Sequence, residues 1–81
     1  MLDVYKKYVA VDAHFTEDGR IRPTSIYWGD GRIFEVDRIS DVRPAASLKA
    51  GGAGIRYTVS ILGKETYIFL EENRWFVEAK Y

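Results

Sequence analysis

Hydrophobic and polar residues alternate along much of this chain, with the period of two that is typical of a strand buried on one face. The clearest run places Ile55, Tyr57, Val59 and Ile61 on the same face. The pattern predicts six strands, which cover residues 9–15, 24–28, about 32 to 42, 55–61, 66–70 and 75–79.

Residues that favour a reversal of the chain separate these strands. They lie in residues 16–20, 29–31, 62–65 and 71–74. Within the third strand the alternation slips near Asp37 and Arg38. We expect a β-bulge or a sharp bend at that point.

Residues 44–50 have the composition of one or two helical turns. Pro44 suits the first helical position, and Gly51 suits the position after the last. Gly52 and Gly54 follow before the next strand. Glycines that follow a helix predict a flexible cap, whereas a phosphate-binding loop precedes a helix N-terminus.

Six short antiparallel strands with one helical turn and a bent third strand predict an all-β fold. A small SH3-like barrel is our first expectation, and a strongly bent open sheet is the second. An OB-type barrel ranks third because its strands are usually longer and its helix more substantial. The 81 residues make a single domain, since a chain of this length has no room for a second core.

The composition excludes several classes of protein. Hydrophobic residues make up 47% of the chain, which is too many for a disordered protein. Twelve basic residues balance twelve acidic ones, so no overall charge attracts nucleic acid or an anionic membrane. No apolar run approaches the length of about 18 residues that a membrane span needs. Because the chain has no cysteine, and small secreted domains usually carry disulfides, we expect a cytoplasmic protein.

One stretch of the chain, residues 42–64, contains no acidic side chain. Its four basic residues are Arg43, Lys49, Arg56 and Lys64. If the helical turn lies beside the next strand, these side chains would contact a phosphate backbone, with Tyr57 or an exposed Trp as a stacking surface. The alternative is a solvated surface whose charges are balanced by acids of neighbouring strands.

Residues suited to catalysis or metal binding are few. Asp12 and His14 share a strand face, where a carboxylate would orient an imidazole. Asp37 and Asp41, beside the expected bend, are candidates for a pair of acids. A surface role explains all four residues, so we assign no catalytic, metal-binding or cofactor-binding residue and expect no enzyme.

The four Phe, six Tyr and two Trp residues exceed what so small a core needs. The expected core consists of Phe15, Ile26, Trp28, Phe34, Val36, Val59, Ile61, Phe69, Trp75 and Val77. Among the aromatic residues left outside are Tyr5, Tyr8, Tyr27, Tyr57, Phe76 and Tyr81. Exposed aromatic side chains are enriched where proteins meet partners, so this surplus predicts a partner surface.

Most of the chain resembles small bacterial β-rich proteins of unknown function. The resemblance lies in residues 19–43 (G-R-I-R-P-T-S-I-Y-W-G-D-G-R-I-F-E-V-D-R-I-S-D-V-R) and 45–57 (A-A-S-L-K-A-G-G-A-G-I-R-Y). It implies a stand-alone cytoplasmic protein and transfers no functional residue. A proline followed by Ile-x-Trp, Gly-Arg and an alternating strand is also similar to SH3-like barrels.

These observations predict a non-enzymatic module that binds a macromolecule, with a protein as the first expected partner and no cofactor. Nucleic-acid contact through residues 42–64 is the alternative, and a carboxylate-based enzyme is third. The candidate contact residues are Tyr27, Arg43, Lys49, Arg56, Tyr57 and Lys64.

Overall fold

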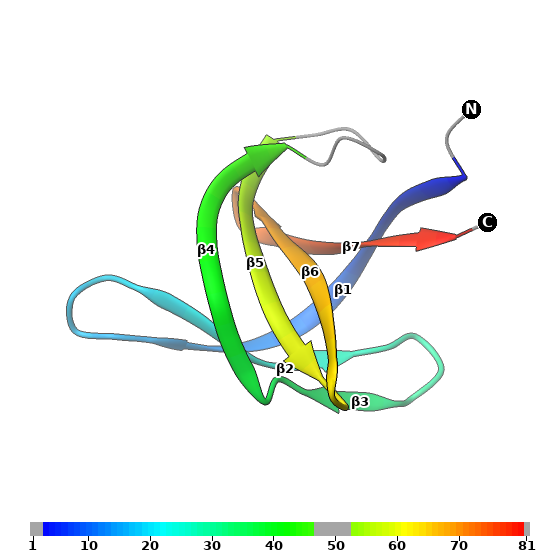
Figure 1. Ribbon diagram of the computed structural model, residues 1–81, viewed down its shortest axis with the longest axis horizontal. Coiled ribbons are helices and arrows are strands. Elements are labelled where there is room, and N and C mark those ends of the chain that lie inside the picture. Colours follow the sequence, from blue (N-terminus) through cyan, green and yellow to red (C-terminus); the bar gives the residue numbers. More distant parts are fainter. Residues whose placement is uncertain (1–2, 47–52, 81) are drawn as a thin grey trace.

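The computed structural model describes residues 3–46 and 53–80, which form one antiparallel sheet of seven strands. The sheet curls strongly, so that its two edges approach each other in a half-barrel (Figure 1). The order across the sheet is β3-β2-β1-β7-β6-β5-β4. The strands are β1 (Val4–Phe15), β2 (Ile21–Tyr27), β3 (Ile33–Glu35), β4 (Arg38–Ala46), β5 (Ala53–Ile61), β6 (Lys64–Glu71) and β7 (Arg74–Lys80).

Strands β3 and β4 follow each other in the chain but lie at opposite edges of the sheet. Val36 and Asp37 connect them. The Val36 amide donates to the Thr24 carbonyl of β2 at 2.9 Å, and the Asp37 amide donates to the Ser60 carbonyl of β5 at 2.8 Å. Two consecutive residues therefore join the two ends of the sheet, which closes the half-barrel at this corner.

The expected bend near Asp37 and Arg38 is confirmed, and it divides the expected third strand into β3 and β4. The count of six strands is therefore wrong, because the corner at residues 36–37 separates two strands that pair with different neighbours. The first strand also begins earlier than expected, at Val4, because residues 4–9 pair with residues 75–80 of β7.

The helical turn expected at residues 44–50 is wrong where the structure describes it. Pro44 and Ala45 continue β4 and pair with Ile55 and Gly54. Proline is tolerated there because β4 is an edge strand, in which every second amide has no partner in the sheet. Residues 47–50 lie outside the described part. The described residues contain no helix that is long and apolar enough to cross a membrane.

The main core lies on the inner face of the curled sheet. Its buried members are Ile26, Tyr57, Val59, Ile68 and Leu70, against which Val9, Val11, Ile21, Val36, Ile39, Ile61, Trp75 and Val77 pack. The expected burial of Ile26 and Val59 is confirmed. The expected burial of Phe15 is wrong, since 69% of this residue is exposed near the end of β1.

A second buried cluster lies on the outer face. Phe69 and Phe76 alternate with the inner residues of β6 and β7, and their rings stack with centroids 4.8 Å apart. Tyr8 meets the Phe76 ring edge-on, and the Lys6 ammonium lies 5.1 Å from its centroid. Phe76, which we expected outside the core, is 0% exposed. The sheet is thus buried on both faces near its centre.

Gly54 lies inside β5 and not in the flexible cap that the glycine pattern predicts. A Cβ atom at this position would overlap the backbone oxygen of Leu70 on β6. Gly54 therefore allows a close approach of two backbones, for which glycine is required. Gly51 and Gly52 lie outside the described residues.

We predict that Phe76→Ala lowers the free energy of unfolding by about 3–5 kcal/mol, because it removes one of the two stacked rings and leaves a cavity beside Phe69. Phe15→Ala removes an equally large but exposed ring, so its effect should stay within about 0.5 kcal/mol. Equilibrium denaturation in urea measures both. Equal effects of the two substitutions would contradict the outer cluster as a buried element.

Candidate functional site

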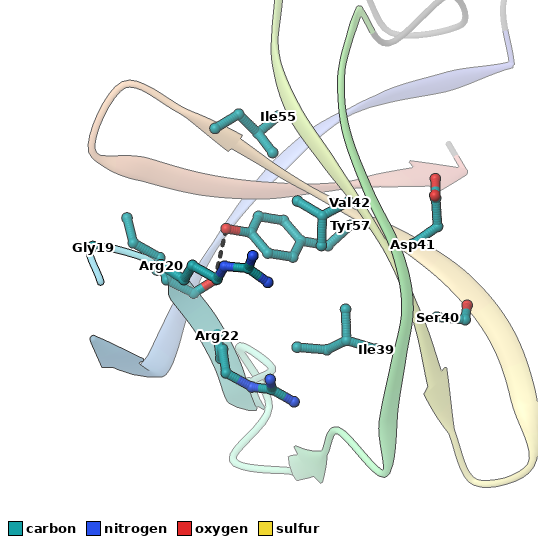
Figure 2. A pocket seen from close by; sticks show the side chains of 10 residues that line it. Gly19, Arg20, Arg22, Ile39, Ser40, Asp41, Val42, Ile55 and Tyr57 are labelled. Carbon is teal, nitrogen blue, oxygen red and sulfur yellow. Dashed lines mark hydrogen bonds between the residues drawn. The ribbon is translucent and has the colours of Figure 1, made fainter. Parts of the chain in front are cut away.

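A groove of about 680 Å³ lies where the edges of the half-barrel face each other (Figure 2). Residues 19–22, at the start of β2, line one wall, and residues 39–42 of β4 line the other. Ile55 and Tyr57 of β5 contribute the floor. We call this feature the edge groove.

Both walls are strand edges. β4 is the last strand of the sheet, so among residues 3–46 and 53–80 no strand pairs with its outer side. β2 pairs with β3 from Ser25 to Tyr27, and the Thr24 carbonyl accepts the Val36 amide, so among the described residues no strand pairs with residues 21–23 on that side. Away from the corner at Val36 and Asp37, the two edges carry backbone groups that no adjacent strand binds.

Tyr57 links the floor of the groove to the β2 wall. Its hydroxyl donates a 2.7 Å hydrogen bond to the backbone oxygen of Ile21, as Figure 2 shows. The phenol thus takes the place of an N–H from a neighbouring strand, and the Ile21 carbonyl is directed into the groove. Burial raises the pKa of Tyr57, which keeps the hydroxyl protonated as a donor.

The expectation that Tyr57 lies outside the core is wrong, because only 3% of it is exposed. Its ring packs 5.3 Å from that of Trp75 and is not open for stacking on a base. Tyr57 shares its strand face with Val59, which is buried in the same core.

On the opposite wall, Val42 offers both its backbone and its side chain to the groove. Pro44 pairs with Ile55, and because proline has no N–H, this must be a non-hydrogen-bonded pair. Val42, two residues earlier in the same register, is therefore also non-hydrogen-bonded to β5. Its N–H and C=O point away from the sheet, while its side chain, 51% exposed, shares the face of Tyr57.

Within the described chain, some of the arginines around the groove form ion pairs, and one does not. Arg20 pairs with Asp18 at 3.3 Å. Arg43 binds Asp41 through Nε at 2.6 Å, and this hydrogen bond lowers the pKa of the Asp41 carboxyl. Arg22 extends toward β4 in Figure 2 and makes no ion pair with any described residue.

Two of the four basic residues of the acid-free segment lie side by side. Arg43 and Arg56 are direct cross-strand partners on the outer face of β4 and β5. The Arg56 guanidinium lies 4.5 Å from the centroid of Tyr67, an aromatic residue outside our predicted contacts that is 42% exposed. The Nε atom of Arg56 is buried without a hydrogen-bond partner.

The remaining predicted contacts lie elsewhere. Lys64 begins β6 and pairs with Ile61, at the opposite end of β5 from Arg56. Tyr27 lies on β2, where its hydroxyl donates to Asp12 at 2.6 Å, a bond that raises the pKa of the phenol. Lys49 lies outside the described residues. The five predicted contact residues that the structure describes do not form one surface.

One carboxylate of each candidate catalytic pair is bound by another side chain. The Asp12 carboxylate accepts the Tyr27 hydroxyl, and Asp41 holds Arg43. His14 and Asp37 line a neighbouring depression of about 260 Å³, which shares Arg22 and Ile39 with the edge groove. Within residues 3–46 and 53–80, no three His, Asp or Glu side chains gather as metal ligands would.

Fold and groove together define a small all-β domain, an antiparallel sheet curled into a half-barrel. No protein-family model, curated protein or solved structure matches this chain. The resemblances based on residues 19–43 and 45–57 therefore have no support from these comparisons.

We predict that Tyr57→Phe lowers the free energy of unfolding by about 1 kcal/mol, because the Ile21 carbonyl loses its donor. Tyr27→Phe removes a hydroxyl whose hydrogen bond is exposed, and its effect should be smaller. Urea denaturation of both variants measures the difference. A Tyr57→Phe protein as stable as the wild type would contradict a structural link across the groove.

Proposed function

We propose that this protein is a non-enzymatic binding module that holds a segment of a protein partner in the edge groove. The observation that carries the proposal is the meeting of two unpaired strand edges over an apolar floor. The volume of about 680 Å³ falls within the range of about 300–1,000 Å³ that is typical of ligand clefts.

The exposed surface of the groove favours a macromolecular partner. Val42 and Ile55 are 51% and 36% exposed, although both face the interior side of the sheet. Apolar side chains that line an open groove gain free energy when a partner covers them. The engagement of Asp12 and Asp41 by Tyr27 and Arg43 favours binding over acid–base catalysis.

We place this module in a reducing cytosol, because a secreted chain of 81 residues would usually be stabilised by disulfides and this one has no cysteine. We also propose an SH3-like architecture in a bacterial protein. The strong curl of the antiparallel sheet and the short β3 beside the closing corner support this architecture.

Nucleic-acid contact is a second candidate function, on a different surface. The cross-strand pair of Arg43 and Arg56, with the exposed ring of Tyr67 beneath Arg56, favours it. Arginine beside an exposed aromatic ring suits a phosphate backbone with a stacked base.

We predict that a displayed library of short random peptides contains binders whose affinity falls by at least about tenfold with Val42→Glu, since a charge would be buried in the groove. Ile33→Glu is the matched control, because Ile33 is 57% exposed on the other edge strand, β3. Affinities measured by calorimetry should be unchanged in this control. Binders that are equally insensitive to both substitutions would contradict the groove as the site.

The same proteins, titrated with labelled single-stranded DNA at low salt, separate the second candidate from the first. Nucleic-acid contact predicts that replacing Arg43 and Arg56 together with Gln weakens DNA binding while Val42→Glu leaves it unchanged. If the DNA does not bind at low salt, where electrostatic attraction is strongest, this candidate is excluded.

A further inference from the structure

We infer that the partner segment binds as an added β-strand along the free edge of β4, with an apolar residue facing Val42 and an acidic residue facing Arg22. The inference rests on the proposed function and specifies how the groove recognises its partner. The occupant is an extended acidic peptide segment.

On the backbone of β4, Val42 has both a donor and an acceptor free for a partner strand. Pro44 and Ile55 form a non-hydrogen-bonded pair, and in an antiparallel ladder every second pair is of this kind. Val42, two residues before Pro44, is therefore also in a non-hydrogen-bonded pair, and its N–H and C=O point away from β5. An unpaired donor and acceptor on one residue form the docking unit that an antiparallel strand uses. A partner residue opposite Val42 would satisfy both groups at once.

On the β2 wall, the Ile21 carbonyl also faces the groove, and it is satisfied by the Tyr57 hydroxyl instead of by a strand. Tyr57 therefore holds the β2 edge in place when no partner strand occupies the groove. This allows the groove to stay open, with β4 as the edge that accepts a partner.

Two features of β4 limit the length of strand that it accepts. Pro44 has no N–H to offer beyond Val42. Before Val42, the register shifts between Ile39 and Asp41, which disrupts regular pairing. Pairing is therefore restricted to a short segment of the partner centred on Val42, and such a restriction also protects the edge from indiscriminate sheet extension.

The charges around the groove favour a partner that carries an acidic residue. Asp41 is occupied by Arg43 and Asp18 by Arg20, whereas Arg22 reaches toward β4 without an ion pair among the described residues. A carboxylate on the partner would complete the charge balance of the groove and would gain from the fixed fork of the guanidinium. The floor formed by Ile55 and Tyr57 accepts the apolar residue opposite Val42.

The decisive experiment uses peptides from the library that bind the wild-type protein and lose affinity with Val42→Glu. Each backbone amide of such a peptide is N-methylated in turn, which removes one donor without changing any side chain. Strand addition predicts that one or two methylated positions lose at least about tenfold in affinity while their neighbours do not. In hydrogen exchange, the Val42 amide should become protected on binding.

The charge is tested separately. Arg22→Gln should weaken an acidic peptide several-fold, and replacing the acidic residue of the peptide with glutamine should remove this difference. Arg20→Gln is the control, because Arg20 already pairs with Asp18, and its effect should be smaller.

The possible failures are distinguishable. Groove-dependent binding with no sensitivity to N-methylation would overturn strand addition and leave the proposed function intact. Absence of any groove-dependent binder would overturn both. Protection of the Val42 amide in the peptide-free protein, appearing with dimerisation as concentration rises, would show that a second copy occupies the edge and would also overturn this inference.

Discussion

The two backbone hydrogen bonds at Val36 and Asp37 are the constraint on which the rest of this structure depends. They join β2 and β5 through two consecutive residues, at 2.9 and 2.8 Å, and so bring opposite ends of one sheet together. A corner of this kind closes the backbone of the half-barrel at one end, and the Tyr57 side chain adds a second link from β5 to β2. Beyond the corner the edges of β2 and β4 diverge, and the edge groove is the space that this divergence leaves.

The sheet buries side chains on both of its faces. This burial stabilises the small domain although its edge groove stays exposed. A chain of this size buries only about 60% of the surface that its unfolded form exposes, so each large side chain matters. The inner core around Val59 is supplemented by the stacked rings of Phe69 and Phe76 outside. Lys6 covers the Phe76 ring and binds Glu71 at 2.8 Å, which lowers the pKa of that carboxyl.

Local alternation predicted most of the strands and the bend, because those features depend on neighbouring residues. It misassigned Pro44 and Phe76, whose environments depend on an edge position and on a second buried face. Tyr57 was within reach of sequence reasoning, since it shares the period of Val59. The groove was not, because residues 19–22 and 39–42 meet only through long-range pairing. The acid-free pattern did find Arg43 and Arg56, which lie on adjacent strands.

Hydrogen exchange of individual backbone amides in the free, monomeric protein tests the central claim most directly. A half-barrel pinned at one corner predicts slow exchange at Val36 and Asp37, comparable with that of the buried strand residue Ile68. The Val42 amide, on an open edge, should exchange within about tenfold of its rate in an unstructured peptide. Slow exchange at Val42 together with fast exchange at Val36 and Asp37 would contradict both the closing corner and the free edge.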